Sequence, residues 1–263
     1  ADFVANASHE LRTPLAALSG FIETLRGPAR DDPAARDRFL SIMHEQAQRM
    51  ARLIADLLSL SRIELNEHTP PAGQVRLGEI IRTIVDGLEF KAAGKQIRIV
   101  LDAPPPNGAA ATRLDDLPAV SGDDDELTQV FQNLIDNAIK YGRDGSAVRI
   151  AGWIVAPAPA AVGAGTPLPQ RRLERSAVAV AVMDEGEGIA REHLPRLTER
   201  FYRVETARSR ELGGTGLGLA IVKHILNRHR GALDIDSVVG SGSAFTVHLP
   251  IARGRAAAEQ SAD

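Results

Sequence analysis

Apolar residues at helical spacing fill the first 65 residues of the chain, with one interruption. From Phe3 to Leu25 they recur at steps of four and three, the spacing of a helix packed in a bundle. Breaks at Gly27-Pro28 and Asp31-Asp32-Pro33 separate this stretch from a second apolar pattern, which runs from about Ala34 to Leu65. The two segments predict an antiparallel helical hairpin. Because a hairpin alone cannot bury both apolar stripes, we expect a second copy of the chain to complete a four-helix bundle as a homodimer.

The first helical segment contains an unusual polar string, Ser8-His9-Glu10-Leu11-Arg12-Thr13-Pro14-Leu15. His9 lies outside the apolar stripe, and Pro14 is expected to bend the helix because it removes a backbone hydrogen bond. An exposed histidine beside a carboxylate is a candidate nucleophile. The alternative is a solvated His-Glu pair, which is the commoner arrangement for an isolated surface histidine.

A second polar string is Asn133-Leu134-Ile135-Asp136-Asn137-Ala138-Ile139-Lys140-Tyr141. On a helix, Asn133, Asn137, Lys140 and Tyr141 lie along one side and an apolar stripe lies next to them. Buried amides need partners, and a magnesium-bound polyphosphate would supply them, with amide oxygens on the metal and lysine on phosphate. A polar flank that simply faces water is the alternative.

Composition excludes several classes of protein. The net charge of -3 argues against a nucleic-acid binder that relies on bulk basicity, and the absence of cysteine excludes disulfides and thiolate zinc sites. No apolar run approaches the roughly 18 residues of a membrane span, and no signal segment opens the chain. Because the chain opens without Met inside a patterned segment, we expect an upstream part to be missing.

The remaining pattern alternates helices and strands. Asp123 is a plausible cap for the helix that carries Asn133. The other predicted elements are helices over Leu77–Ala93 and Ala220–Arg230, and strands over Gln96–Leu101, Leu117–Ser121, Ala147–Val155, Ser176–Met183, Ala232–Ser237 and Ser243–Leu249.

Two glycine-containing segments suit a nucleotide. In Asp184-Glu185-Gly186-Glu187-Gly188-Ile189 the glycines allow close approach of the backbone to a flat ligand, and the carboxylate can accept a hydrogen bond. Gly213-Gly214-Thr215-Gly216-Leu217-Gly218-Leu219 leads into a helix, where unpaired N–H groups suit phosphate. Neither segment has the spacing of a P-loop or of a dinucleotide fingerprint.

Together these strings resemble the sequence boxes of the sensor histidine kinases of two-component systems, over essentially the whole chain. Within this family the hairpin is most similar to the phosphate-regulon sensor kinases. The matching segments are the H box at 8–15, the N box at 133–141, the G1 box at 184–189, the F box at 199–203 and the G2 box at 213–219. Thr198 departs from the family pattern, which usually has phenylalanine there.

The resemblance implies an α+β protein with two domains. Residues 1–66 would form the dimerisation and histidine phosphotransfer hairpin, and 67–74 the linker. Residues 75–252 would form an α/β sandwich of the GHKL, or Bergerat, type that binds ATP. In this domain 156–175 is a Pro- and Gly-rich insertion, for which a spacer without function is the favoured interpretation. Val204–Leu212 would be the ATP lid, and 253–263 a disordered tail.

The resemblance also implies roles for residues. His9 would be the phosphoacceptor, Glu10 would accept a hydrogen bond from its other ring nitrogen, and Thr13 would orient water in a phosphatase reaction. Asn137, with Asn133, would hold Mg²⁺. The residues implied to bind ATP are Asn133, Asn137, Lys140, Tyr141, Asp184, Gly186, Gly188, Ile189, Arg203, Gly214, Thr215, Gly216, Leu217 and Gly218.

The implied function is ATP-dependent autophosphorylation followed by transfer to an aspartate of a response regulator, with phosphatase activity towards the same regulator. Asn133 stands where hydrolytic relatives have a catalytic glutamate, which disfavours a simple ATPase. A dimeric scaffold that binds nucleotide without catalysis is the other alternative. We expect no nucleic-acid partner, and a cytoplasmic location with a membrane anchor only in the missing upstream part. The input signal, the cognate regulator and the choice between phosphorylation within or between protomers stay open.

Overall fold

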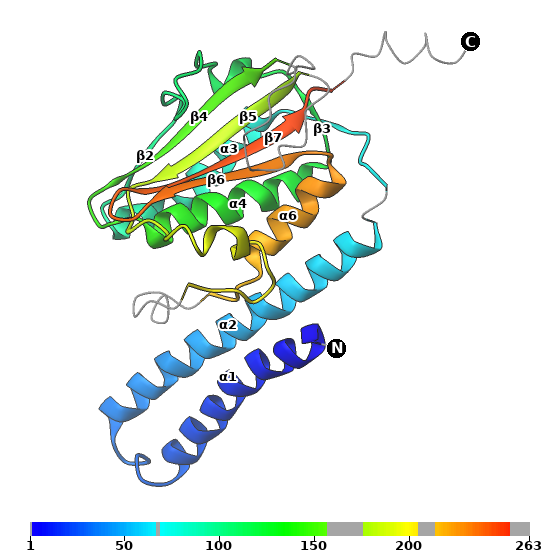
Figure 1. The fold of residues 1–263 in the computed structure, drawn as a ribbon. Helices are drawn as coiled ribbons and strands as arrows, with labels where there is room; N and C mark the ends of the chain where they lie inside the picture. Colours follow the sequence, from blue (N-terminus) through cyan, green and yellow to red (C-terminus); the bar gives the residue numbers. More distant parts are fainter. Residues whose placement is uncertain (1, 67–68, 157–175, 205–213, 253–263) are drawn as a thin grey trace. The chain divides into compact units, whose positions relative to one another are not determined.

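The computed structural model describes residues 2–66, 69–156, 176–204 and 214–252 (Figure 1). They form two compact units, one within residues 1–62 and 196–221 and the other within 63–195 and 222–263. The predicted domain boundaries at 66 and 75 stay predictions. The predicted tail lies outside the described residues, and so do the predicted insertion and ATP lid apart from Ala156 and Val204.

The helical hairpin consists of α1 (Asp2–Arg26) and α2 (Pro33–Leu65), within about a residue of the predicted limits (Figure 1). Asp32 caps α2, because its carboxylate accepts from the Ala35 N–H at 3.0 Å. Phe21 and Phe39 stack with ring centroids 5.3 Å apart and so fix the two helices to each other near the turn. Pro14 lies inside α1 as expected.

The second unit is built on a five-stranded sheet in the order β2-β4-β5-β7-β6. β2 runs parallel to β4, and the other pairs are antiparallel. Helices α3, α4 and α6 lie along the sheet (Figure 1). The bounds are α3 Leu77–Gly94, β2 Arg98–Val100, α4 Asp124–Tyr141, β4 Ala147–Val155, β5 Ala177–Asp184, α6 Gly218–Arg228, β6 Ala232–Val238 and β7 Gly242–Pro250.

The position of α4 follows from its sequence. Asp123 caps the helix by accepting from the Glu126 N–H at 3.0 Å, as predicted. One stripe of α4 is buried, namely Leu127, Val130, Phe131, Leu134, Ile135, Ala138 and Ile139. β5 runs through the centre of the sheet, and its residues from Ala177 to Val182 are all buried, as expected for a strand covered on both faces.

Four local features differ from the predictions. A short sheet pairs β1 (Gln74–Val75) with β3 (Val120–Ser121), although Gln74 was expected in the linker. β2 and β3 are shorter than the predicted strands. A 3₁₀ turn, Leu114–Asp116, lies in a predicted loop. These elements have two or three residues each, too few for a hydrophobic period to mark their ends. Within the described chain, no helix has the length and apolarity needed to cross a bilayer.

Candidate functional site

The polar string on α1 presents His9 to solvent. Its imidazole makes no hydrogen bond to another described residue. The neighbouring Glu10 carboxylate accepts from Arg49 of α2 at 3.1 Å, so in this structure it is engaged by Arg49 and not by the imidazole. One turn later, Thr13 is also exposed, and its hydroxyl donates to the His9 carbonyl at 3.3 Å.

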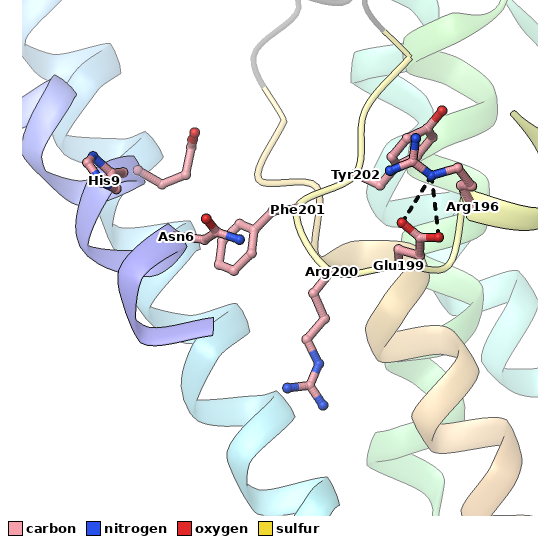
Figure 2. A pocket seen from close by; sticks show the side chains of 8 residues that line it. Asn6, His9, Arg196, Glu199, Arg200, Phe201 and Tyr202 are labelled. Atoms are coloured by element: carbon pink, nitrogen blue, oxygen red, sulfur yellow. Dashed lines mark hydrogen bonds and ion pairs between the residues drawn. The ribbon is translucent and has the colours of Figure 1, made fainter. Parts of the chain in front are cut away.

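A pocket of about 360 Å³ opens beside His9 (Figure 2). Asn6, His9 and Glu10 line it from α1, and residues of the F box line it from the other side. The Arg196 guanidinium is held there by Glu199 at 3.2 Å and by the Tyr202 ring, whose centroid lies 4.2 Å away. The imidazole therefore borders an open, polar space.

On α4, Asn133 and Asn137 are half-buried, one turn apart. Neither amide makes a hydrogen bond to another described residue. Polar groups that are shielded from water normally have hydrogen-bond partners. Because these two amides have none among the described residues, they are available to a ligand. The end of the helix is fixed by Lys95, whose ammonium donates to the carbonyls of Ile139, Lys140 and Gly142 at 2.8 to 3.1 Å. No pattern in the sequence indicated this cap.

The predicted adenine-binding segment begins at the last residue of β5. The Asp184 carboxylate accepts from the Gly186 N–H at 2.8 Å and is also hydrogen-bonded by the Ser243 backbone. Burial raises its pKa above the usual value, although these two hydrogen bonds act in the opposite direction. The carboxylate is thus partly shielded from water but keeps capacity for another donor.

Glycine is required in this segment because other backbone lies against it. A Cβ on Gly186 would lie 2.5 Å from the Tyr141 carbonyl oxygen, so the segment packs on the end of α4. Gly188 has φ +69°, and a Cβ there would overlap the Val238 carbonyl of β6. The structure therefore brings Asp184, Gly186, Gly188, Ile189 and Tyr141 together.

The second glycine segment, at 214–218, belongs to the unit that contains the hairpin. Gly216 has φ +70° and its carbonyl accepts from the Phe201 N–H at 2.8 Å. The Thr215 hydroxyl lies 2.7 Å from the carboxylate of Asp56 in α2, and burial raises the pKa of Asp56. Arg203 is half-buried in the same unit. The helix α4 and Asp184 belong to the other unit.

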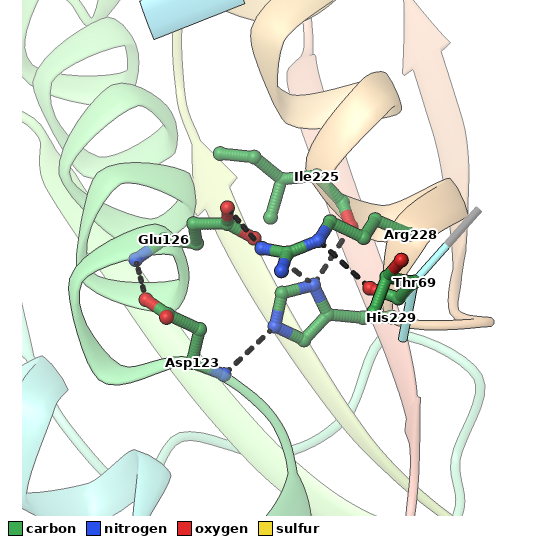
Figure 3. A network of polar contacts seen from close by, with 6 residues as sticks. All are labelled: Thr69, Asp123, Glu126, Ile225, Arg228 and His229. Atoms are coloured by element: carbon green, nitrogen blue, oxygen red, sulfur yellow. Dashed lines mark hydrogen bonds and ion pairs between the residues drawn. The ribbon is translucent and has the colours of Figure 1, made fainter. Parts of the chain in front are cut away.

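A buried polar network joins the start of α4 to the end of α6 (Figure 3). His229 accepts from the Asp123 N–H at Nε2, 3.0 Å, and its Nδ1 lies 2.8 Å from the Ile225 carbonyl. The backbone N–H can only donate, so the ring carries its proton on Nδ1 and is neutral; burial lowers its pKa. Arg228 pairs with Glu126 and donates to the Thr69 carbonyl at 3.0 Å.

The network was not predicted from the sequence. Its members are separated by up to 159 positions, and no local pattern joins them. Burial raises the pKa of Glu126, although the neighbouring Arg228 acts in the opposite direction. The network joins the first turn of α4 to the end of α6, and so helps to hold α4 in place.

Comparisons with known proteins agree on one family. The model for the "His Kinase A (phospho-acceptor) domain" matches residues 1–66, and the model for "Histidine kinase-, DNA gyrase B-, and HSP90-like ATPase" matches 122–253. Among curated relatives, the phosphate regulon sensor protein PhoR of Pseudomonas aeruginosa is 40% identical, with 94% of this chain and 49% of the relative covered. The sensor-like histidine kinase SenX3 of Mycolicibacterium smegmatis is 38% identical, with 95% and 57% covered. The chain spans about half the length of these relatives.

A solved structure supports the fold. The histidine kinase AdeS of Acinetobacter baumannii superposes with a TM-score of 0.64 at 24% identity, with 93% of this chain and 98% of that chain covered. At this identity the likeness concerns the fold alone.

Proposed function

The chain belongs to the sensor histidine kinases, and we propose from this premise that it uses ATP to phosphorylate its own His9. The phosphoryl group then passes to an aspartate of a response regulator. The proposal places these reactions in the cytoplasm, where ATP is available, and a membrane anchor in the part of the protein outside this chain.

The pair of amides on α4 carries the proposal. Asn133 and Asn137 are half-buried and have no partner among the described residues, and amide oxygens are ligands that Mg²⁺ accepts. Asn137, with Asn133, would hold the ion, which neutralises charge on the β- and γ-phosphates when bound. Asn133 also lacks the carboxylate that would activate water, which favours transfer to histidine over hydrolysis.

The remaining ATP contacts are proposed from the matched boxes. Asp184 accepts from the adenine amino group, and Gly186, Gly188 and Ile189 allow the base to approach the backbone. Lys140 and Tyr141 contact phosphate or ribose. The residues proposed to contact the phosphates are Arg203, Gly214, Thr215, Gly216, Leu217 and Gly218.

In the reaction, a ring nitrogen of His9 attacks the γ-phosphorus in line, forming an N–P bond while the bond to the β,γ-bridging oxygen breaks and ADP leaves. Glu10 accepts a hydrogen bond from the other ring nitrogen and makes the ring more nucleophilic. For this role the Glu10 carboxylate must either leave Arg49 or accept from Arg49 and the imidazole at the same time.

Incubation with γ-labelled ATP and Mg²⁺ tests the acceptor. The parent should become labelled, and the label should be stable to base and labile to acid, as a phosphohistidine is. We expect the His9→Gln variant to take up no label while it still binds ATP. His44→Gln, which changes another exposed histidine of the hairpin, is the matched control and should label normally. Label retained on His9→Gln would contradict the assignment.

A phosphatase activity is the second part of the proposal. The exposed Thr13 hydroxyl lies one turn after His9, where it can orient water against the phospho-aspartate of a bound regulator. We expect Thr13→Ala to slow dephosphorylation of a phospho-regulator and to leave autophosphorylation intact. Thr24→Ala is the control, because Thr24 makes the same bond to the carbonyl four residues earlier in α1. Equal rates for Thr13→Ala and the parent would remove this role.

The proposed enzyme is a homodimer. Large apolar side chains of both hairpin helices are exposed in the single chain, namely Leu15, Ile22, Leu40, Ile54 and Leu58. A second copy would cover them in a four-helix bundle. Light scattering should give twice the chain mass for the parent, and Leu58→Glu should shift the equilibrium towards the monomer.

A further inference from the structure

One row of the sheet leads from the proposed adenine-binding carboxylate to the far strand. Asp184 of β5 is paired with Ser243 of β7, and Ser243 is paired with Ser237 of β6. Directly opposed residues of antiparallel strands carry their side chains on the same face. The two serine hydroxyls are 2.9 Å apart, so a continuous polar row runs across three strands.

The Ser237 hydroxyl is fully used. It accepts from the Ile189 N–H at 2.8 Å, lies 2.9 Å from the Ser243 hydroxyl and donates to the Gly242 carbonyl at 2.9 Å. A hydroxyl offers one donor and two acceptor positions, and all three have a partner here. Ile189 is the last residue of the segment 184–189, which leaves the sheet after Asp184.

The β6–β7 hairpin holds this segment at three successive residues. The Gly240 N–H donates to the Glu187 carbonyl at 2.7 Å, Gly188 packs on the Val238 backbone, and Ile189 is bonded by Ser237. The first two contacts are between backbones. The third is made by the side chain of Ser237, so a substitution there can remove this bond and leave the two backbone contacts unchanged.

We propose that Ser237 is a positioning residue for the segment 184–189, and that its hydroxyl strengthens the preference for adenine over guanine. The inference rests on the proposed function, since it assumes that Asp184 accepts from the adenine amino group. Guanine presents a carbonyl oxygen at the equivalent position, which a carboxylate repels. Discrimination therefore depends on how rigidly the carboxylate and the adjoining backbone are held.

Ser237→Ala tests this in the full chain, by calorimetric titration with ATP and with GTP in the presence of Mg²⁺. Loss of the hydroxyl leaves the Ile189 N–H unpaired, and we expect the Kd for ATP to rise about tenfold. The Kd for GTP should change by less than about twofold, because GTP gains little from the carboxylate. Ser237→Thr keeps the hydroxyl and should restore the parental values.

The control is Ser241→Ala, which removes an exposed hydroxyl from the same hairpin and should leave both Kd values unchanged. If Ser237→Ala does not fold, Ser237→Cys replaces it with the same expectations, because a thiol keeps the shape but is a weak acceptor. Equal ATP affinity for parent and variant, or equal losses for ATP and GTP, would overturn the inference. Failure of the parent to bind ATP would instead overturn the proposed function.

Discussion

The proposed phosphoacceptor segment of α1 and the segment around Asp184 meet opposite structural requirements. His9 is exposed on a single helix and its imidazole has no hydrogen-bond partner among the described residues. Asp184 pairs with Ser243 of β7 and lies beside glycines at which a Cβ would meet other backbone. A group that must meet both an ATP site and a regulator has to stay accessible. A group that selects one base has to be fixed before the ligand arrives.

The strongest test of this contrast makes the same substitution in both regions. Gly188→Ala should destabilise the sheet unit by more than about 3 kcal/mol, because a Cβ there meets the Val238 backbone and φ is positive. Gly20→Ala in α1 should stabilise the hairpin by up to about 1 kcal/mol, since nothing lies within 4 Å and alanine favours helix. Urea unfolding can be followed by Trp153 fluorescence for the sheet and by circular dichroism for the helices. Similar losses at both glycines would contradict the contrast.

The next largest effect is expected at the carboxylate itself. Asp184→Asn should weaken ATP binding roughly 10- to 100-fold, the range for a hydrogen bond to a charged group. Its sheet unit should be no less stable than the parent's at neutral pH, because the desolvation penalty on the charge disappears. Titration calorimetry and urea unfolding measure the two quantities. Asp236→Asn, at an exposed position of β6, should change neither, and a large loss of stability in Asp184→Asn would show that the charge is structural.

Lowering the pH should weaken ATP binding but should not reduce the contribution of Asp184 to stability. The folded-state pKa of Asp184 lies above its unfolded value, so its contribution to stability is full at low pH and is lost as pH rises through the folded pKa. ATP binding needs the carboxylate and should therefore weaken as pH falls through the same raised pKa, above the usual value of about 3.9. The measurement is the ratio of ATP affinities of the parent and Asp184→Asn as the pH is lowered from neutrality. A ratio that does not change with pH would contradict a role of the Asp184 charge in ATP binding.

The smallest effect is expected on the acceptor helix. Glu10 and Arg49 form an ion pair whose side chains are 39% and 30% exposed, and pairs of this kind contribute less than about 1 kcal/mol. A double-mutant cycle with Glu10→Gln and Arg49→Gln should give a coupling energy in that range, and it should shrink in high salt. A coupling energy several times larger would mean that the proposed acceptor segment is held as rigidly as the segment around Asp184.

Periodic features were predictable from the sequence, and features that depend on register were not. The limits of α1, α2 and β4 and the Asp123 cap follow from spacing and capping chemistry. The parallel pairing of β2 with β4 leaves no local trace, because it is set by packing between distant segments. The same holds for the Arg49 contact with Glu10.

The candidate site also combines residues that were predictable from the sequence with residues that were not. The glycines and amides stand out because their chemistry is unusual in their surroundings. Ser237 does not, since serine is common near turns, and its importance appears only when the strand register sets it beside Ile189. The roles assigned to individual ATP-binding residues remain predictions that the binding experiments address.

The row of Asp184, Ser243 and Ser237 also has a consequence during synthesis. A ribosome adds roughly 5 to 20 residues per second, so several seconds pass between the emergence of Asp184 and that of the hairpin formed by β6 and its partner strand β7. Throughout that interval the nascent chain carries the proposed adenine-binding carboxylate without the hairpin that holds its segment. The acceptor hairpin, made first and from local contacts, can form early. A growing chain would therefore display its histidine well before it could recognise a nucleotide.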